Sequence, residues 1–212
     1  VTELAQKTSI PVTTTLTGIG AFDETDELSL GMLGMHGTTE ANMAITKSDL
    51  IIALGARFDD RVTGDLDTFA PKAKIIHVDI DSSEIGKIVE PDVSILGDVK
   101  DVLQKLNNLV ERKDNKNEWH QKIDKWKQLD GEKESETNNV TPEEIIKEID
   151  KITNSEAIIT TEVGQHQMWA AQYFMFKKPR SLLTSGGLGT MGYGLPAAVG
   201  AQIGNPDSTV IC

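Results

Sequence analysis

A glycine-rich segment constrains this chain more strongly than any other stretch of its sequence. Five glycines fall within residues 186–194, directly after the apolar run 181–184 and before the small-residue run 197–201. A strand, a glycine-rich turn and a helix start, in that order, bring backbone N–H groups close to a phosphate. The segment therefore predicts contact with a phosphorylated cofactor, and a tight structural turn is the alternative.

The same segment also matches the dinucleotide-binding fingerprint, through Gly187, Gly189 and Gly192. The full fingerprint requires an acidic residue at the end of a second strand, about 20 residues further on. Asp207 stands at that spacing, but it lies in an Asn-Pro-Asp-Ser turn that precedes a strand. We therefore discount a nicotinamide-binding fold at this segment.

The charge balance and the single cysteine narrow the class of protein. The 212 residues carry a net charge of −12, because 21 Lys and Arg are outnumbered by 33 Asp and Glu. This balance disfavours nucleic acid and anionic membranes as partners, since both require a basic face. Cys212 is the only cysteine, so an internal disulfide is impossible and we expect a cytoplasmic protein. The first residues are typical of a helix end and the last of a strand interior, so we expect a piece of a longer chain.

Alternating strand and helix patterns define the fold class. Residues 49–54 and 74–80 are largely apolar runs, typical of strands buried on both faces of a parallel sheet, and residues 93–96 form a third. Asp98 can cap the helix that follows, whose apolar positions recur at helical spacing. The pattern predicts an α/β fold with a doubly wound parallel sheet. Residues 29–36, rich in Gly and Met, are predicted to be irregular.

Changes in composition divide the chain into three regions. Residues 1–112 are predicted to form one α/β domain and residues 140–212 the start of a second, with a polar, charge-dense linker at residues 113–139 between them. Two tryptophans and an isoleucine of this linker share one helical face, which predicts a linker helix packed on a domain surface.

The second domain begins with a helix and a strand that lead to a polar loop. Thr141 starts the helix, with a capping hydroxyl, a proline in the first turn and acids at the positive end of the dipole. Residues 157–161 are predicted as a strand, residues 162–166 as the loop at its end and residues 167–174 as the next helix. The loop places a glutamine and a histidine beside a flexible glycine.

Two loops of the first domain carry chemistry suited to a nucleotide, because ligands of parallel sheets sit beyond the carboxyl ends of the strands. Residues 55–61 contain two arginines suited to phosphate, which Asp59 and Asp60 would offset. A surface ion-pair network is the alternative. Asp79 ends the next strand, where an acid is well placed to bond ribose hydroxyls, and a helix N-cap is the alternative.

The four histidines are scattered along the chain. His36 lies among glycines, which favours close approach of a ligand, whereas His77 is predicted to lie in the core and His120 to be exposed. With one terminal cysteine, the chain has no zinc-ligand spacing, and we expect no metal site formed by its own residues.

Four ordered motifs closely resemble the catalytic large subunit of acetolactate synthase (acetohydroxyacid synthase), a thiamine-diphosphate enzyme. They are Gly-Met-His-Gly at 34–37, Gly-Ala-Arg-Phe-Asp-Asp-Arg-Val-Thr-Gly at 55–64, Val-Gly-Gln-His-Gln-Met-Trp-Ala-Ala at 163–171 and the glycine-rich segment at 185–198. The likeness runs almost end to end and weakens only in the linker. It implies most of a central FAD-binding domain, without its first strand, and the truncated start of a thiamine-diphosphate-binding domain.

The resemblance implies cofactor contacts at matching positions, and it implies no catalytic residue within this chain. Thiamine diphosphate is expected at Val163, Gly164, Gln165, His166, Gly189 and Met191, the last supporting the bent shape of the cofactor. FAD, with a structural role, is expected at Thr15, Leu16, Leu33, Gly34, Met35, His36, Gly55, Ala56, Arg57, Asp59, Arg61, Val62, Asp79, Ile80, Asp98, Gln167, Met168 and Gly186. Met35 and Asp60 match positions where herbicides touch the access channel of the family.

The activity that the resemblance implies belongs to branched-chain amino-acid biosynthesis, which yields valine, leucine and isoleucine. Pyruvate is decarboxylated, and the remaining two-carbon unit is joined to a second 2-ketoacid, either pyruvate or 2-ketobutyrate. The ligands of Mg²⁺ and the catalytic glutamate of the family would lie outside this chain, so we expect the chain alone to be inactive. The full-length protein is expected to be a homo-oligomer, with a possible regulatory small subunit.

Two other functions stay open as alternatives. One is a different thiamine-diphosphate carboligase, such as glyoxylate carboligase. The other is a non-catalytic flavin- or nucleotide-binding module.

The resemblance also predicts a gap in the first sheet. In the strand order 3-2-1-4-5-6, strand 1 lies in the middle of the sheet, and in the family this strand precedes Val1. Unpaired backbone inside a sheet is unfavourable, because buried N–H and C=O groups need partners. We therefore expect rearrangement, strand swapping or partial disorder in this domain.

Overall fold

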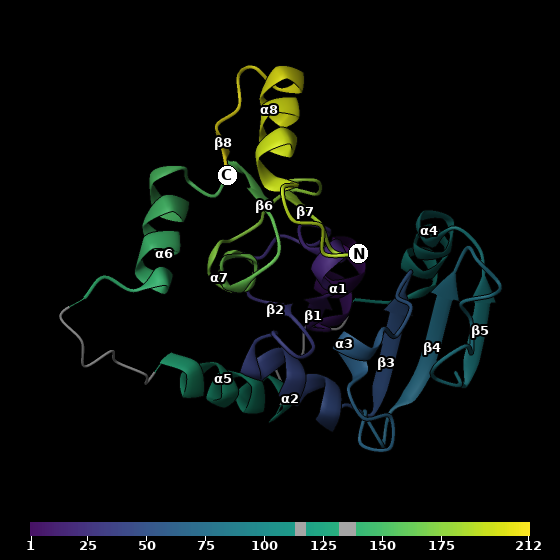
Figure 1. The fold of residues 1–212 in the computed structure, drawn as a ribbon. Helices are drawn as coiled ribbons and strands as arrows, with labels where there is room; N and C mark the ends of the chain where they lie inside the picture. The colour runs from purple at the N-terminus through teal and green to yellow at the C-terminus, as the bar shows by residue number, and fades with distance from the viewer. Residues whose placement is uncertain (113–117, 132–138) are drawn as a thin grey trace. The chain divides into compact units, whose positions relative to one another are not determined.

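The computed structural model describes residues 1–112, 118–131 and 139–212. The chain forms two compact units, of which the first comprises Val1–Pro11 and Leu33–Glu132 and the second Val12–Met32 and Lys133–Cys212 (Figure 1). Every strand pair in the described parts of the chain is parallel, which confirms the predicted α/β class. Across the same ranges, the structure contains no helix with both the length and the apolar character that a membrane span requires.

The first unit is built on a three-stranded sheet in the order β3-β4-β5. Its strands are β3 (Leu50–Leu54), β4 (Lys74–Asp79) and β5 (Val93–Leu96), and Ala53 pairs with His77 across the first two. The central strand β4 is largely buried, whereas β5 is mostly exposed. The prediction that all three strands are buried on both faces is therefore wrong for β5, which lies at the sheet edge.

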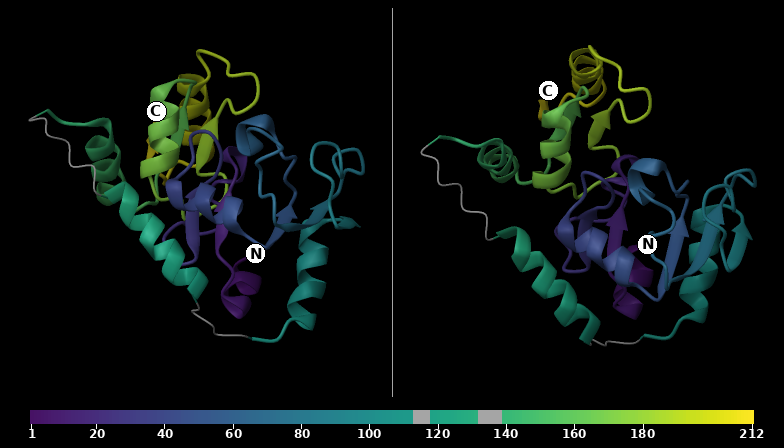
Figure 2. Two further views of the ribbon diagram at one scale, coloured as in Figure 1. Left: turned by 90° about the horizontal axis from the view of Figure 1, so that it is seen from below. Right: turned by 60° about the horizontal axis from the view of Figure 1, so that its bottom comes forward.

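The two longer capped helices of the first unit are α2 (Thr39–Lys47) and α4 (Val99–Leu109). The helix α2 starts after Thr38, whose hydroxyl accepts the N–H of Ala41, and α4 starts after Asp98. Such caps satisfy N–H groups that the first turn leaves without partners. The helix α4 runs beside the sheet and contacts β4 (Figure 2). The cap predicted at Asp98 is confirmed.

The remaining helices of the first unit include one in the predicted linker. They are α1 (Thr2–Thr8), which packs against α4, the short α3 (Asp60–Thr63) and α5 (Glu118–Gly131). The helix α5 packs against α2 with Ile123 buried, as predicted for a helix on a domain surface. One prediction is wrong, because His120 is half-buried and its Nε2 lies 2.8 Å from the carbonyl oxygen of Ser9. The ends of the predicted linker, residues 113–117 and 132–138, lie outside the described residues.

The second unit contains a sheet in the order β7-β6-β8 and three helices around it. Its strands are β6 (Ile158–Thr161), β7 (Leu182–Thr184) and β8 (Val210–Ile211). Its helices are α6 (Pro142–Ile152), α7 (Gln165–Tyr173) and α8 (Gly194–Gly204). The start of α6 is a full capping box between Thr141 and Glu144, which confirms the predicted helix start.

A segment from the first third of the sequence belongs to this second unit. It contains β1 (Val12–Thr14), the 3₁₀ turn η1 (Leu16–Gly18) and β2 (Ser29–Met32), and β1 pairs with β2. The strand β2 lies where the sequence predicts irregular structure, and its alternate residues Leu30 and Met32 are buried. That alternation of buried and half-buried residues is typical of a strand.

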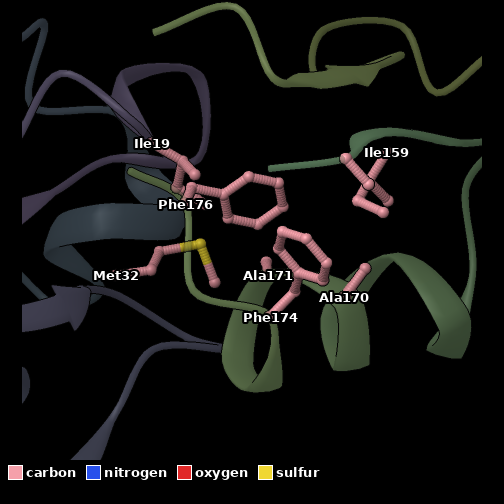
Figure 3. Packing of buried hydrophobic residues seen from close by; sticks show 8 residues of the cluster. Ile19, Met32, Ile159, Ala170, Ala171, Phe174 and Phe176 are labelled. Atoms are coloured by element: carbon pink, nitrogen blue, oxygen red, sulfur yellow. The ribbon is translucent and has the colours of Figure 1, made fainter. Parts of the chain in front are cut away.

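Hydrophobic packing explains why this segment groups with the C-terminal region. Ile19 and Met32 join a cluster with Ile159, Phe174 and Phe176, and the two phenylalanine rings lie 4.8 Å apart (Figure 3). The domain predicted for residues 1–112 includes residues 12–32, whereas the structure groups these residues with the second unit. The strands β1 to β5 form two separate sheets, β1-β2 in the second unit and β3-β4-β5 in the first.

Candidate functional site

The carboxyl ends of the strands in the first unit form one edge that collects three predicted site residues. The N–H of Gly55, directly after β3, donates to the carbonyl of Val78 at 2.8 Å. The N–H of Gly97, directly after β5, donates to the carbonyl of Asp79 at 2.9 Å. These bonds bring Gly55, Asp79 and the loop that ends at Asp98 to neighbouring positions, where parallel sheets take their ligands.

The loop after β3 combines an ion pair with an exposed cation. Arg57 and Asp59 form a salt bridge at 2.9 Å, and the Arg57 side chain is still 66% exposed. Asp59 also caps α3 by accepting the N–H of Arg61 at 3.1 Å. This backbone hydrogen bond is the main reason that the pKa of Asp59 is lowered, with smaller contributions from Asp60 and the two arginines. The ion-pair and phosphate interpretations of this loop are therefore compatible, because the guanidinium remains accessible.

Asp79 is a buried acid at the end of the central strand. One carboxylate oxygen accepts the N–H of Asp81 at 2.9 Å. Residues 80–92 form turns and not a helix, so the alternative interpretation of Asp79 as a helix N-cap is wrong. Its other carboxylate oxygen lies 4.0 Å from Nε2 of His77, which is fully buried as predicted.

The segment 33–36 is fastened to the loop after β3. The N–H of Met35 donates to the carbonyl of Arg61 at 2.8 Å. Gly34 has φ of +101°, and a Cβ there would lie only 2.4 Å from the same carbonyl oxygen. Close approach of two backbones therefore requires glycine at this position. Asn42, which sequence reasoning missed, holds Gly34 by accepting its N–H at 2.8 Å and donating to its carbonyl at 2.9 Å.

A hydroxyl network in the second unit orients one predicted FAD contact. Gln167 donates from its amide to the hydroxyl of Thr184 at 2.7 Å, and the hydroxyl of Thr161 donates to the same oxygen at 2.8 Å. A Cβ on Gly186 would lie 3.2 Å from Thr17 and 3.6 Å from Leu16. The structure thus brings Leu16 and Gly186 side by side. The sequence does not identify Thr184 as a site residue, because in the sequence it is an ordinary residue of a predicted strand.

The loop after β6 lies against the glycine-rich segment. A Cβ on Gly189, whose φ is +77°, would lie 3.4 Å from a methyl group of Val163. The predicted loop 162–166 is shorter than expected, because α7 begins at Gln165. Gln165 and His166 therefore occupy the first turn of a helix, where the positive end of the dipole favours an anion.

The residues present fit diphosphate-bearing cofactors. Gly55, at φ of +63°, leaves the sheet edge open, since a Cβ there would meet only one methyl group of Val99 at 3.8 Å. In the glycine-rich segment, Leu188 and Met191 are 92% and 85% exposed, although both are large and apolar. Apolar side chains held in the open beside a turn rich in N–H groups suit a ligand that has an aromatic part and a phosphate part. Within the described ranges, no group of three or more His, Cys, Asp and Glu could hold a metal ion.

Comparison with known proteins defines the family. Residues 1–106 match the central domain of thiamine pyrophosphate enzymes, and residues 162–212 match their C-terminal TPP-binding domain. The chain therefore belongs to the thiamine pyrophosphate enzymes. The second match contains both loops that meet at Val163 and Gly189.

Within this family, the chain is similar to plant acetolactate synthases. It is 54% identical over 214 residues to acetolactate synthase 1 of Nicotiana tabacum, 54% over 211 residues to acetolactate synthase 1 of Zea mays and 51% over 212 residues to the enzyme of Arabidopsis thaliana. Each alignment covers 96% of this chain but only 31–33% of the relative. The chain thus spans about a third of the length of these relatives. The resemblance that the four motifs carry is confirmed.

The names of these relatives correct one expectation. All three are described as chloroplastic. The expected cytoplasmic location is therefore wrong.

Proposed function

We propose that the intact protein is an acetolactate synthase, a transferase that decarboxylates pyruvate and joins the remaining two-carbon unit to pyruvate or 2-ketobutyrate. The observation that carries the proposal is identity of 51–54% along 96% of the chain, which includes both loops around Val163 and Gly189. The role in the synthesis of valine, leucine and isoleucine follows from the activity and is part of the same proposal. So is assembly into a homo-oligomer, with or without a regulatory subunit.

The residues proposed to hold thiamine diphosphate are those of the two adjoining loops in the second unit. When bound, this cofactor supplies a nucleophilic carbon and accepts the electrons released by decarboxylation. The backbone of the glycine-rich segment provides N–H donors and close approach, as the positive φ of Gly189 allows. Met191 offers an exposed apolar side chain to the rings of the cofactor. The Mg²⁺ ion that would accompany the diphosphate is proposed to bind outside the described residues.

FAD is proposed as a second, structural cofactor. In the first unit, the accessible guanidinium of Arg57 suits a diphosphate, and the carboxylate of Asp79 suits ribose hydroxyls. In the second unit, Gln167 is held in one orientation by Thr184, and Leu16 lies beside Gly186. Each set of contacts, taken within its own unit, supports flavin binding by the residues that the resemblance implies.

The test is a carboligation assay on the intact protein. We expect acetolactate from pyruvate only when thiamine diphosphate and Mg²⁺ are supplied, and a yellow protein from which FAD can be released. Glyoxylate as the preferred substrate would instead support the other carboligase. Bound flavin without any product would support a non-catalytic module and would contradict the proposal.

A further inference from the structure

His77 is a buried polar residue without a hydrogen-bond partner among the described residues. Its side chain is completely buried in β4, and neither ring nitrogen has a hydrogen-bond partner in the described parts of the chain. The neighbours on its face of the sheet include Ile75 before it on the same strand, Ala53 opposite it on β3 and Ser94 opposite it on β5, and none of them bonds to the ring. Leaving two buried nitrogens unpaired is unfavourable, and an apolar ring of similar size would avoid the penalty.

The position of His77 links two parts of the proposed nucleotide site. His77 and Asp79 are two residues apart on one strand, so their side chains lie on the same face. Nε2 of His77 lies 4.0 Å from one carboxylate oxygen of Asp79, whose other oxygen accepts the N–H of Asp81. On another side, the rings of His77 and Phe58 pack in a T-shaped arrangement with their centroids 5.1 Å apart.

Phe58 connects this ring to the loop that carries the exposed arginine. It is buried between Arg57 and Asp59 and has φ of +54°, a conformation that a bulky residue adopts only when its surroundings impose it. The imidazole of His77 is thus packed under the loop that would contact phosphate and beside the acid that would contact ribose. A residue that is unfavourable for the fold, at a junction between two ligand-binding elements, is typical of a functional position.

We propose that His77 is a positioning residue for an adenine dinucleotide bound at the carboxyl edge of this sheet. In this role, Nε2 of His77 donates a hydrogen bond to Asp79 when the Asp79 carboxylate accepts a hydrogen bond from a ribose hydroxyl of the ligand. The inference rests on the proposed FAD binding. The imidazole acts through Asp79 without touching the ligand itself. A shift of the carboxylate toward the ring by about 1 Å closes the 4.0 Å separation to hydrogen-bond length.

The test compares flavin affinity with apoprotein stability in three variants of the intact protein. His77→Phe keeps a ring against Phe58 and removes both nitrogens, His77→Gln keeps one donor, and Ile75→Val is the control on the same strand face. We expect His77→Phe to raise the Kd for FAD on the order of tenfold, while the Tm of the apoprotein stays the same or rises. The affinity of His77→Gln should lie between wild type and His77→Phe, and Ile75→Val should change the Kd less than about twofold.

A double-mutant cycle distinguishes positioning from a purely structural role. If His77 acts through Asp79, His77→Phe has no further effect on the Kd in an Asp79→Asn background. Additive effects, an unchanged Kd in His77→Phe, or a lower apoprotein Tm together with the weaker binding would each overturn the inference. Wild-type protein that fails to bind FAD would refute the proposed FAD site instead. The same cycle measured with ADP would then decide on His77, with an absent or additive effect counting against it.

Discussion

Glu24 and Phe176 hold each other through two hydrogen bonds in the second unit. The N–H of Phe176 donates to a carboxylate oxygen of Glu24 at 2.8 Å, and the N–H of Glu24 donates to the carbonyl of Phe176 at 3.2 Å. The other carboxylate oxygen is buried without a partner among the described residues. The two hydrogen bonds connect the segment that contains β1 and β2 to the residues that follow α7. They also hold the ionisable carboxyl group of Glu24 in a poorly solvated position.

The first prediction concerns the pH dependence of stability. Burial raises the pKa of Glu24 to about 7, against the opposing effect of the Phe176 N–H, and Asp150 and Asp23 raise it further. Because the folded pKa exceeds the unfolded one, the stabilising contribution is full below about pH 4.5 and is lost as the pH rises through about 7. A shift of this size is worth about 3 kcal/mol. Glu24→Gln keeps the acceptor for Phe176 but cannot ionise, so we expect it to be more stable than wild type at pH 8.

Urea unfolding of the intact protein between pH 5 and 8, in steps of about one unit, measures this difference. The unfolding free energy of wild type should fall relative to Glu24→Gln as the pH rises. Glu148→Gln, at an exposed position of α6, is the control and should follow wild type. Parallel pH profiles for wild type and Glu24→Gln would refute the prediction.

The second prediction concerns the glycine at which two backbones meet. Gly34→Ala puts a methyl group 2.4 Å from the carbonyl oxygen of Arg61, in a conformation with φ of +101°. Either the segment 33–36 or the loop after β3 must move, so we expect a loss of about 2–4 kcal/mol in stability and weaker FAD binding. Gly64→Ala is the control, because Gly64 also has positive φ but nothing within 4 Å of its Cβ position.

Thermal unfolding and flavin titration compare the two variants. Gly64→Ala should lose only the backbone strain, about 1–2 kcal/mol, and keep its flavin affinity. Equal losses in both variants would mean that the contact with Arg61 contributes nothing beyond strain.

Local sequence pattern predicts much of the framework and part of the site. Apolar runs locate β3 and β4, and polar caps locate the starts of α4 and α6, because both features act over a few neighbouring residues. The start of α7 at Gln165 is missed, since the N-cap is Gly164 and no side chain caps the helix. The glycines and charged residues of the site are identified through motifs, because close approach of a ligand to the backbone favours glycine and binding of phosphate favours arginine.

The features that the sequence does not reveal depend on contacts between distant residues. Residues 12–32 pack with the C-terminal region because Ile19 and Met32 meet Phe174 and Phe176, more than 140 positions away. Asn42 and Thr184 hold the site through side chains whose partners the local pattern does not identify. His77 is predicted as a core residue, and only the structure reveals that its nitrogens lack partners there. Tertiary packing therefore decides the supporting contacts of the site.

The third prediction concerns the hydroxyl that orients Gln167. Thr184→Val keeps the shape of the side chain but removes the oxygen that accepts both the Gln167 amide and the Thr161 hydroxyl. Since Thr161 is buried, we expect a loss of about 2 kcal/mol in stability and weaker FAD binding. Thr184→Ser retains the oxygen and should restore the affinity, as flavin titration will measure. Failure of Thr184→Ser to restore binding would show that the methyl group, and not the hydrogen bonds, matters.

The last prediction separates two roles of Asp98, which caps α4 and is also expected to contact FAD. Its carboxylate accepts the N–H groups of Lys100 at 2.8 Å and Asp101 at 3.4 Å. Asp98→Ala loses the cap and should cost about 1 kcal/mol, whereas Asp98→Asn keeps an acceptor oxygen and should stay within about 0.5 kcal/mol of wild type. If the carboxylate contacts the flavin, both variants should bind FAD more weakly than wild type. If Asp98 acts only as a helix cap, the one change should be the lower stability of Asp98→Ala. Urea unfolding and FAD titration on the same preparations distinguish the two, and normal flavin affinity in Asp98→Asn would leave Asp98 with the cap as its sole role.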